Sequence, residues 1–361
     1  MRDKNFRPRR WLRFSLRTLL VLLTVVAVWL GFAADRAHRQ RRIVAELRET
    51  RSVVEYDWQQ RDPSKPKPPR GTIREAPGPR WLRKLVGDEY FQHVVTVMVS
   101  EYRPGARFLS HIDDLPELTN LQVVHAHTND DDLRAIGRLR KLQFLLVTSL
   151  DRGGFTDAGV AHLAQLKQLE NLTIGSPGLY SAGAPGMTGK GLRVLATLPK
   201  LRSLRVVGMG LTDEGIASLA QIKQLEYLSV SVDRMTERGY APLGKLTRLK
   251  SLELDKSFLT SGELPADADD AGIEQLARLK NLRSLRLTNF NLTDAGLAKL
   301  SALENLIELD IVHPEPAYTE EGVAYLQDRL PRLSVEHSAW EPMRGQVVGN
   351  LRLHARARQR R

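Results

Sequence analysis

The chain has 361 residues, of which 42% are hydrophobic and 27% charged, a composition that excludes wholesale disorder. It contains no cysteine, which excludes disulfides, thiolate metal sites and cysteine nucleophiles. The net charge of +12 comes from the flanks, because basic residues are in excess over residues 1–110 and 338–361, whereas residues 111–337 are mildly acidic. An acidic body offers no groove for nucleic acid, so no nucleic-acid partner is predicted.

A membrane segment is predicted at the start of the chain. Residues 1–17 form a basic lead, and residues 18–34 carry no charged side chain and are rich in Leu and Val. A helix over the second range would rise about 25 Å, just enough to cross a thin hydrocarbon core. A cleaved signal peptide is the alternative, because residues 31–33 are mostly small, but the apolar run exceeds the usual length of about 7–15 residues. We therefore expect an uncleaved transmembrane helix.

The orientation of this helix follows from the Lys and Arg residues around it. Seven precede the apolar run, and six follow it up to residue 51. This bias slightly favours a cytoplasmic N-terminus. We expect a single-pass protein of the cell membrane whose large C-terminal part lies on the non-cytoplasmic side.

Residues 35–80 are predicted to form a helical and proline-rich stalk. Its first part, 35–51, continues as a short helix with one apolar stripe, and residues 52–59 alternate like a strand. Six prolines between positions 63 and 79 exclude a helix or a central strand there and favour a semi-extended spacer. The apolar stripe of the helix consists of Ile43, Val44 and Leu47. Beyond the stalk, a buried strand is predicted at 94–100.

A leucine pattern, L-x-x-L-x-x-L-x-x-L-x-L, repeats along residues 81–337 with a basic unit of 24 residues and insertions in two copies. The first copy is placed so that Val124 and Ala126 end it. Copies also contain a helix start such as Thr293 to Leu297, where the threonine hydroxyl can cap the helix and the following acid complements the helix dipole. Because the apolar period changes from 3.6 to 2, each copy is predicted to contain one helix and one short parallel strand.

These copies resemble leucine-rich repeats of the T-D-x-G-L subtype, which also occur in ribonuclease-inhibitor-like proteins. Together with the SLRTLL, RQRR and WLRKLVGDEYF segments that precede them, they resemble a family of bacterial membrane-anchored leucine-rich repeat proteins. The resemblance implies an α/β solenoid, with a curved parallel sheet on the concave side, helices on the convex side and an N-terminal transmembrane helix. It implies protein–protein contact and no catalysis. The chain departs from the family after each strand, where Asn, Cys or Thr is usual but Met209, Asp233, Ser257, Phe290 and Pro314 stand.

Three motifs could carry chemistry, and each has a simpler interpretation. Residues 184–191 look like a phosphate loop, but the first glycine and the magnesium-binding Ser/Thr are missing, and the repeat pattern accounts for them. His125 and His127 precede three aspartates without a spaced third metal ligand. The acidic insertion at 261–270 lacks the EF-hand spacing. We therefore predict no enzyme, no cofactor, no metal site and no catalytic residue.

The basic C-terminal tail, 338–361, ends in an arginine-rich run without an acid. Such a run is most often a solvated, disordered end. It could also contact an anionic envelope surface, since each basic residue near such a surface contributes about 1 kcal/mol. The arginines are Arg352, Arg356, Arg358, Arg360 and Arg361.

The strand residues that point away from the core are predicted to line the concave face. Its early end, with Val123, is expected to be apolar and its late end charged. We hypothesise that a protein partner binds there, because aromatic and arginine side chains dominate interface energetics. The alternative is a structural envelope component without a discrete ligand. The predicted partner-binding residues are Phe144, Leu146, Arg205, Tyr227, Glu253, Arg286 and Asp310.

Overall fold

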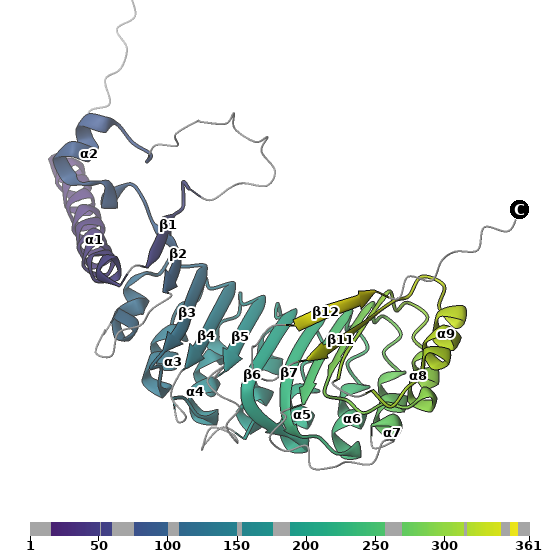
Figure 1. The fold of residues 1–361 in the computed structure, drawn as a ribbon. Helices are drawn as coiled ribbons and strands as arrows, with labels where there is room; N and C mark the ends of the chain where they lie inside the picture. The colour runs from purple at the N-terminus through teal and green to yellow at the C-terminus, as the bar shows by residue number, and fades with distance from the viewer. Residues whose placement is uncertain are drawn as a thin grey trace, which may run out of the picture.

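The computed structural model describes residues 16–50, 52–59, 76–99, 108–149, 154–175, 188–256, 269–313, 316–340 and 347–352. These residues form one 12-stranded sheet in which the strands follow one another in sequence order. The pairs from β2 to β11 are parallel, and the first and last strands pair antiparallel to their neighbours. Figure 1 shows an arc with the strands on its inner side and the repeat helices on its outer side.

The strands of the sheet are β1 Val53–Tyr56, β2 Val94–Val99, β3 Asn120–Ala126, β4 Phe144–Ser149, β5 Asn171–Gly175, β6 Ser203–Thr212, β7 Tyr227–Arg234, β8 Ser251–Lys256, β9 Ser284–Thr288, β10 Glu308–Val312, β11 Ser334–Trp340 and β12 Val347–Arg352. The α-helices are α1 Leu16–Glu49, α2 Arg80–Val86, α3 Asp130–Ile136, α4 Asp157–Ala161, α5 Asp213–Leu219, α6 Glu237–Leu243, α7 Asp270–Leu276, α8 Asp294–Leu300 and α9 Glu320–Arg329. Short 3₁₀-helices lie at η1 Asp88–Tyr90, η2 Phe108–Asp114, η3 His162–Gln165 and η4 Lys190–Thr197.

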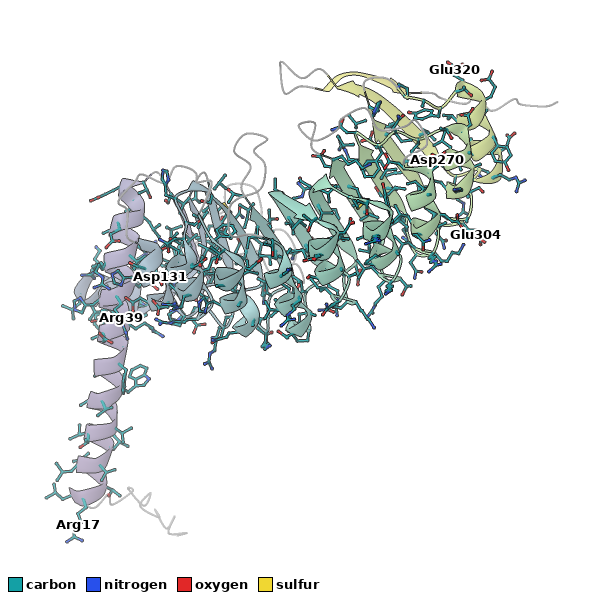
Figure 2. The ribbon with its side chains drawn as sticks, turned by 90° about the horizontal axis from the view of Figure 1, so that it is seen from below. Arg17, Arg39, Asp131, Asp270, Glu304 and Glu320 are labelled. Carbon is teal, nitrogen blue, oxygen red and sulfur yellow. The ribbon has the colours of Figure 1, made fainter. Side chains whose placement is uncertain are left out.

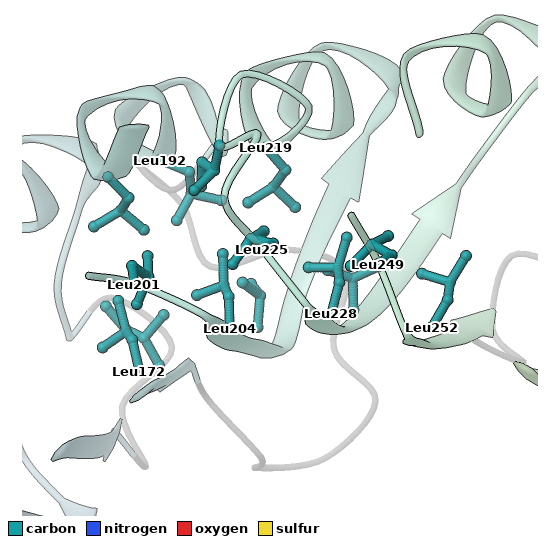
Figure 3. Close-up of a cluster of buried hydrophobic side chains, with 14 of the residues drawn as sticks. Leu172, Leu192, Leu201, Leu204, Leu219, Leu225, Leu228, Leu249 and Leu252 are labelled. Atoms are coloured by element: carbon teal, nitrogen blue, oxygen red, sulfur yellow. The ribbon is translucent and has the colours of Figure 1, made fainter. Parts of the chain in front are cut away.

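The leucines of successive copies stack into one continuous core between the sheet and the helices. Leu204, Leu228 and Leu252 occupy the same position in β6, β7 and β8, and each is fully buried (Figure 3). A single copy has no partner for its apolar face, so burial is achieved only by stacking. The predicted alternation of helix and parallel strand is therefore confirmed, and the chain has a leucine-rich-repeat-like α/β fold.

The position of the first copy differs from the prediction. Leu121 in β3 pairs with Leu145 in β4, and the next inward residue of β3 is Val123, which is fully buried. The prediction that Val124 and Ala126 end this copy is wrong by three residues, because leucine at every third position lets the pattern match in two registers. In the observed register, Leu121 in β3 and Leu145 in β4 are 24 residues apart, which is the basic unit of the repeat.

Threonine hydroxyls cap several repeat helices, as predicted. The exception is Thr212, which precedes α5 and whose hydroxyl accepts no capping hydrogen bond from a backbone amide of that helix. The hydroxyls that accept a hydrogen bond from a backbone amide in the first turn belong to Thr156, Thr236, Thr293 and Thr319.

Helix α1 joins the apolar N-terminal run to the repeats without a break. Residues 16–32 are exposed, and Figure 2 shows this half projecting past the repeats to Arg17. In the second half, Ile43, Val44 and Leu47 are buried against the first repeat, which confirms the predicted stripe. Among the described residues, α1 is long and apolar enough to cross a membrane, a length and composition that also suit a signal sequence.

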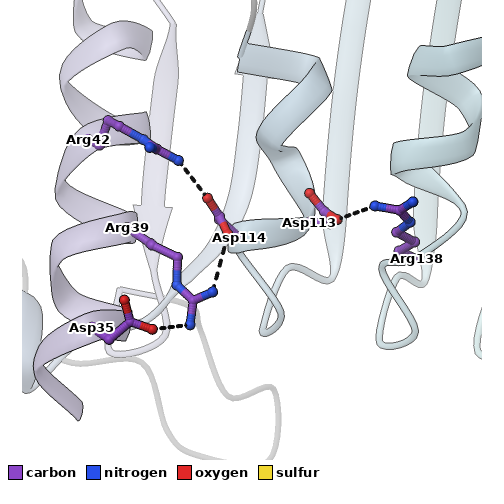
Figure 4. Close-up of polar contacts among 6 residues, drawn as sticks. All are labelled: Asp35, Arg39, Arg42, Asp113, Asp114 and Arg138. Atoms are coloured by element: carbon purple, nitrogen blue, oxygen red, sulfur yellow. Dashed lines mark hydrogen bonds and ion pairs between the residues drawn. The ribbon is translucent and has the colours of Figure 1, made fainter. Parts of the chain in front are cut away.

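Polar contacts fix the second half of α1 to the start of the array (Figure 4). Arg42 forms an ion pair with Asp114 at 2.8 Å, and Arg39 contacts the same carboxylate at 3.6 Å. The buried Gln40 side chain donates to the backbone beside β2 and accepts a hydrogen bond from the amide of Val94 at 3.3 Å. β1 then pairs antiparallel with β2 and forms the edge strand at this end of the sheet, where the alternation of residues 52–59 predicted a strand.

Candidate protein-binding face

The concave face is built from two rows of side chains that point away from the leucine core. The first row lies between the two inward residues of each strand, and the second row precedes them. The strand register therefore fixes the neighbours of each residue across the sheet. The first row contains Gln122, Leu146, Thr173, Arg205, Ser229, Glu253, Arg286 and Asp310; the second contains Asn120, Phe144, Asn171, Ser203, Tyr227, Ser251, Ser284 and Glu308.

Three of the predicted residues meet at the centre of this face. An Arg205 guanidinium nitrogen donates to the Tyr227 hydroxyl at 2.5 Å and lies 2.9 Å from the Glu253 carboxylate. The guanidinium carbon is 5.8 Å from the centre of the Tyr227 ring. Burial raises the pKa of Tyr227, and its hydrogen bond with Arg205 opposes that rise. The arginine is thus held in one orientation on a rigid sheet while almost half of its side chain stays exposed, at 44%.

A second cluster lies toward the C-terminal end of the face. Arg286 and Asp310 form an ion pair at 3.3 Å across β9 and β10. Asp255 follows Glu253 on the same side of β8 and is exposed as a whole residue. Its carboxyl group is partly sheltered from solvent, which raises its pKa to about 6, although the charge of Arg286 opposes this shift. The late end is charged, as predicted, but its arginine and aspartate neutralise each other.

The early end is apolar but smaller than predicted. Phe144 and Leu146 are half-buried on β4 and face the concave side. The expectation that Val123 joins them is wrong, because the corrected register turns Val123 into the core. The apolar patch is thus Phe144 and Leu146, flanked by the amides of Asn120 and Gln122.

Parts of the motifs considered for metal or phosphate chemistry belong to the repeat framework, whereas residues 261–268 of the acidic insertion lie outside the described part of the chain. The Thr188 hydroxyl donates to Asp157 at 2.6 Å, so the end of the phosphate-loop-like segment is a helix start, whereas residues 184–187 lie outside the described part of the chain. Asp269 is buried and paired with Lys256. No group of three or more His, Asp or Glu residues in the described ranges is arranged to hold a metal ion. The final residues of the arginine tail, 353–361, also lie outside the described residues.

One surface feature has no counterpart among the predicted sites. A hollow of about 310 Å³ lies where β7 to β10 begin, in the turns that lead into these strands. Basic side chains surround a single carboxylate there, that of Glu226, and the hydrogen bond from Lys250 lowers its pKa. The feature of the sequence that could have indicated this hollow is the recurrence of Lys and Arg in the turns between helix and strand. The hollow is lined by Glu226, Arg248, Lys250, Asn281, Arg283 and Asn305.

Comparison with known proteins gives neither a matching family model nor a matching curated sequence. Similar solved structures include an internalin (InlF) from Listeria monocytogenes, 18% identical with a TM-score of 0.26, over 68% of this chain and 86% of the internalin. The plant peptide hormone receptor RGFR1, in complex with RGF2, is 16% identical with a TM-score of 0.35, over 64% of this chain and 42% of the receptor. TLR13, in complex with ssRNA13, is 18% identical with a TM-score of 0.38, over 65% of this chain and 31% of TLR13. This chain spans less than half of either of the last two.

Proposed function

We propose that this chain is a membrane-tethered, non-enzymatic leucine-rich repeat module that binds a protein partner through its concave face. The observation that carries the proposal is the cluster of Arg205, Tyr227 and Glu253 on the same continuous sheet as the apolar patch of Phe144 and Leu146, from which β5 separates it. Tyrosine and arginine are the residue types that most often dominate binding energy once they become buried. The tether is α1, through residues 18–34, with the repeats on the non-cytoplasmic side.

The tether is supported by the apolar surface that α1 leaves uncovered. Trp29 and Phe32 are 67% and 72% exposed, and the leucines and valines around them are exposed as well. A patch of this size on a soluble protein requires a covering partner, and a bilayer supplies one over the full length of the run.

The order of the concave face supports recognition by a preformed surface. Arg205 is fixed by two partners, and the strands below it are hydrogen-bonded on both sides. Side chains that are already ordered lose little entropy when a partner covers them. Such a face can bind without rearrangement of the backbone.

Site-specific photocrosslinking in the full chain tests whether a partner contacts this face. A photoreactive residue at Ser229, between Arg205 and Glu253 on the concave side, is compared with one at the exposed Ala217 on α5 of the same repeat. We expect a discrete protein adduct from Ser229 and not from Ala217. An adduct pattern that is the same at both positions would favour the alternative, a structural envelope component without a discrete ligand.

Alanine substitution then tests the predicted anchors against the crosslinked partner. Replacing Phe144, Leu146, Arg205 or Tyr227 should weaken binding by at least about 1 kcal/mol each, about fivefold in Kd, with little change in melting temperature. Loss of binding only in variants of the helix face, such as Arg193→Ala, or of the arginine tail would contradict the concave assignment. Glu253, Arg286 and Asp310 are expected to affect orientation and salt dependence more than affinity.

A further inference from the structure

The two long edges of the solenoid carry opposite charge. Acids collect where strands lead into helices, and bases collect where helices lead into strands, which places each sign at the helix end that its dipole favours. The basic edge consists of the six successive turns 137–143, 165–170, 198–202, 221–226, 244–250 and 277–283, with thirteen Lys or Arg residues and two Glu residues. The turns on either side of these six add four acids at the same edge, Asp113, Asp114, Glu117 and Glu304. The acidic edge carries Asp130, Asp131, Asp132, Asp157, Asp213, Glu214, Asp269, Asp270, Asp294, Glu320 and Glu321.

Most of the charge on the basic edge is not neutralised within the chain. Four of the basic side chains form ion pairs with Asp113, Glu117 or Glu226. The other nine are exposed and have no carboxylate at ion-pair distance within the described part of the chain. They are Arg140, Lys167, Lys200, Lys223, Lys245, Arg248, Arg278, Lys280 and Arg283.

The apolar half of α1 leaves the molecule past this same edge. Arg39 and Arg42 contact Asp114, which lies at the end of η2 where the chain turns toward a strand. Residues nearer the end of α1 lie at the opposite edge, because β1 follows directly and Val53 pairs with Met98 at the end of β2. The residues before position 35 therefore extend beyond the basic edge. In Figure 2 this half runs toward Arg17, away from the side that carries Asp270 and Glu320.

We propose that the basic edge rests on the anionic lipid headgroups of the membrane that α1 crosses, so that the solenoid lies on its side along the bilayer. This inference depends on the tether proposed above. A span that starts beside the edge brings the turns close to the bilayer, and exposed charges act over a Debye length of about 8 Å at physiological ionic strength. In the hollow, Lys250 is already paired with Glu226, whereas Arg248 and Arg283 have no carboxylate at ion-pair distance among the described residues and are available to a headgroup phosphate. The concave face then points along the membrane and stays open to a partner.

The absence of cysteine allows a direct test with single labelled positions in the full chain, inserted in lipid nanodiscs. Thr247→Cys places a fluorophore on the basic edge, and Ala271→Cys places it in the first turn of α7 on the acidic edge; both positions are exposed. Energy transfer to an acceptor lipid reports the distance of each label from the bilayer. We expect higher transfer from Thr247→Cys in phosphatidylglycerol nanodiscs, and a fall of at least about twofold at ~1 M salt, where the Debye length is about 3 Å.

Charge reversal separates edge docking from the mere direction of α1. Lys245→Glu with Arg278→Glu should lower transfer from the Thr247 label in phosphatidylglycerol nanodiscs and leave it unchanged in phosphatidylcholine nanodiscs. The matched control, Arg193→Glu with Arg238→Glu, makes the same change in charge at exposed positions away from the basic edge and should have no effect.

The outcomes that overturn the inference differ from those that overturn the tether. A chain that does not remain in the nanodisc overturns the tether and edge docking together. A chain that remains inserted but shows equal transfer from the two labels overturns edge docking alone. Equal responses to the two charge-reversal pairs also overturn edge docking, because the change in transfer would then not depend on the position of the charges.

Discussion

At the scale of single residues, the T-D-x-G-L motif joins neighbouring repeats. The aspartate of one copy accepts hydrogen bonds from both the backbone amide and the hydroxyl of the threonine in the next copy. The glycine is required for the same reason, because a Cβ at Gly296 would overlap the Asp270 carboxylate. The sequence predicts the cap within a copy, but not this bond between copies, which appears only when the copies are stacked. The pairs are Asp130–Thr156, Asp157–Thr188, Asp213–Thr236, Asp270–Thr293 and Asp294–Thr319.

Removal of one hydroxyl from this series should destabilise the chain measurably. Thr293→Val keeps the shape of the side chain but loses the bond to Asp270 and the cap on Ala295, so we expect a loss of about 2 kcal/mol in the free energy of unfolding. The matched control is Thr212→Val, because Thr212 makes no cap bond and the acid of the preceding copy is replaced by Gly189. Its cost should stay within about 0.5 kcal/mol. Equal shifts of the two variants in urea denaturation would contradict this role.

At the scale of elements, α1 combines an apolar half that stays exposed in the described part of the chain and a half that packs against the core. Its second half covers the first repeat, and β1 then pairs with β2 and becomes the edge strand of the sheet. An open sheet edge presents unpaired backbone groups that can pair with another chain, and a very short edge strand limits such pairing. At this end the edge strand is β1, which has only four residues. The sequence predicts the helix, its stripe and the strand separately. Their packing against the first repeat could not be predicted, because it depends on contacts distant in sequence.

Truncation of the buried stripe should loosen this end of the array. Leu47 is fully buried, so Leu47→Ala should cost about 2–5 kcal/mol through lost burial and the cavity that remains. Hydrogen exchange should then become faster in β1 and β2 and stay unchanged in β9 and β10, because repeats interact mainly with their neighbours. Leu30→Ala, at a position that is 52% exposed, is the control and should leave exchange in β2 unchanged. Uniform acceleration across all strands would contradict a local role for α1.

At the scale of the whole molecule, the repeat period, the core leucines and most helix starts follow from the sequence. The placement of Phe144, Arg205 and Tyr227 on one face follows as well, because alternation along a strand fixes the side to which each residue points. The contact of Arg205 with Tyr227 could not be predicted, since it requires the register between strands. The two charged edges do not follow from the net charge of successive segments, because each edge collects short turns from many copies.

The proposed tether and its orientation can be tested in the same cysteine-free background. Lys and Arg residues are almost balanced around the apolar run, so the sequence favours a cytoplasmic N-terminus only slightly. We expect Glu320→Cys, exposed at the start of α9 on the acidic edge, to react with a membrane-impermeant maleimide in intact bacterial spheroplasts. Ser15→Cys, in the basic lead, should react only after lysis. The opposite pattern would place the repeats in the cytoplasm, and loss of the Ser15→Cys signal from a shortened chain would show that the N-terminal segment is cleaved as a signal peptide.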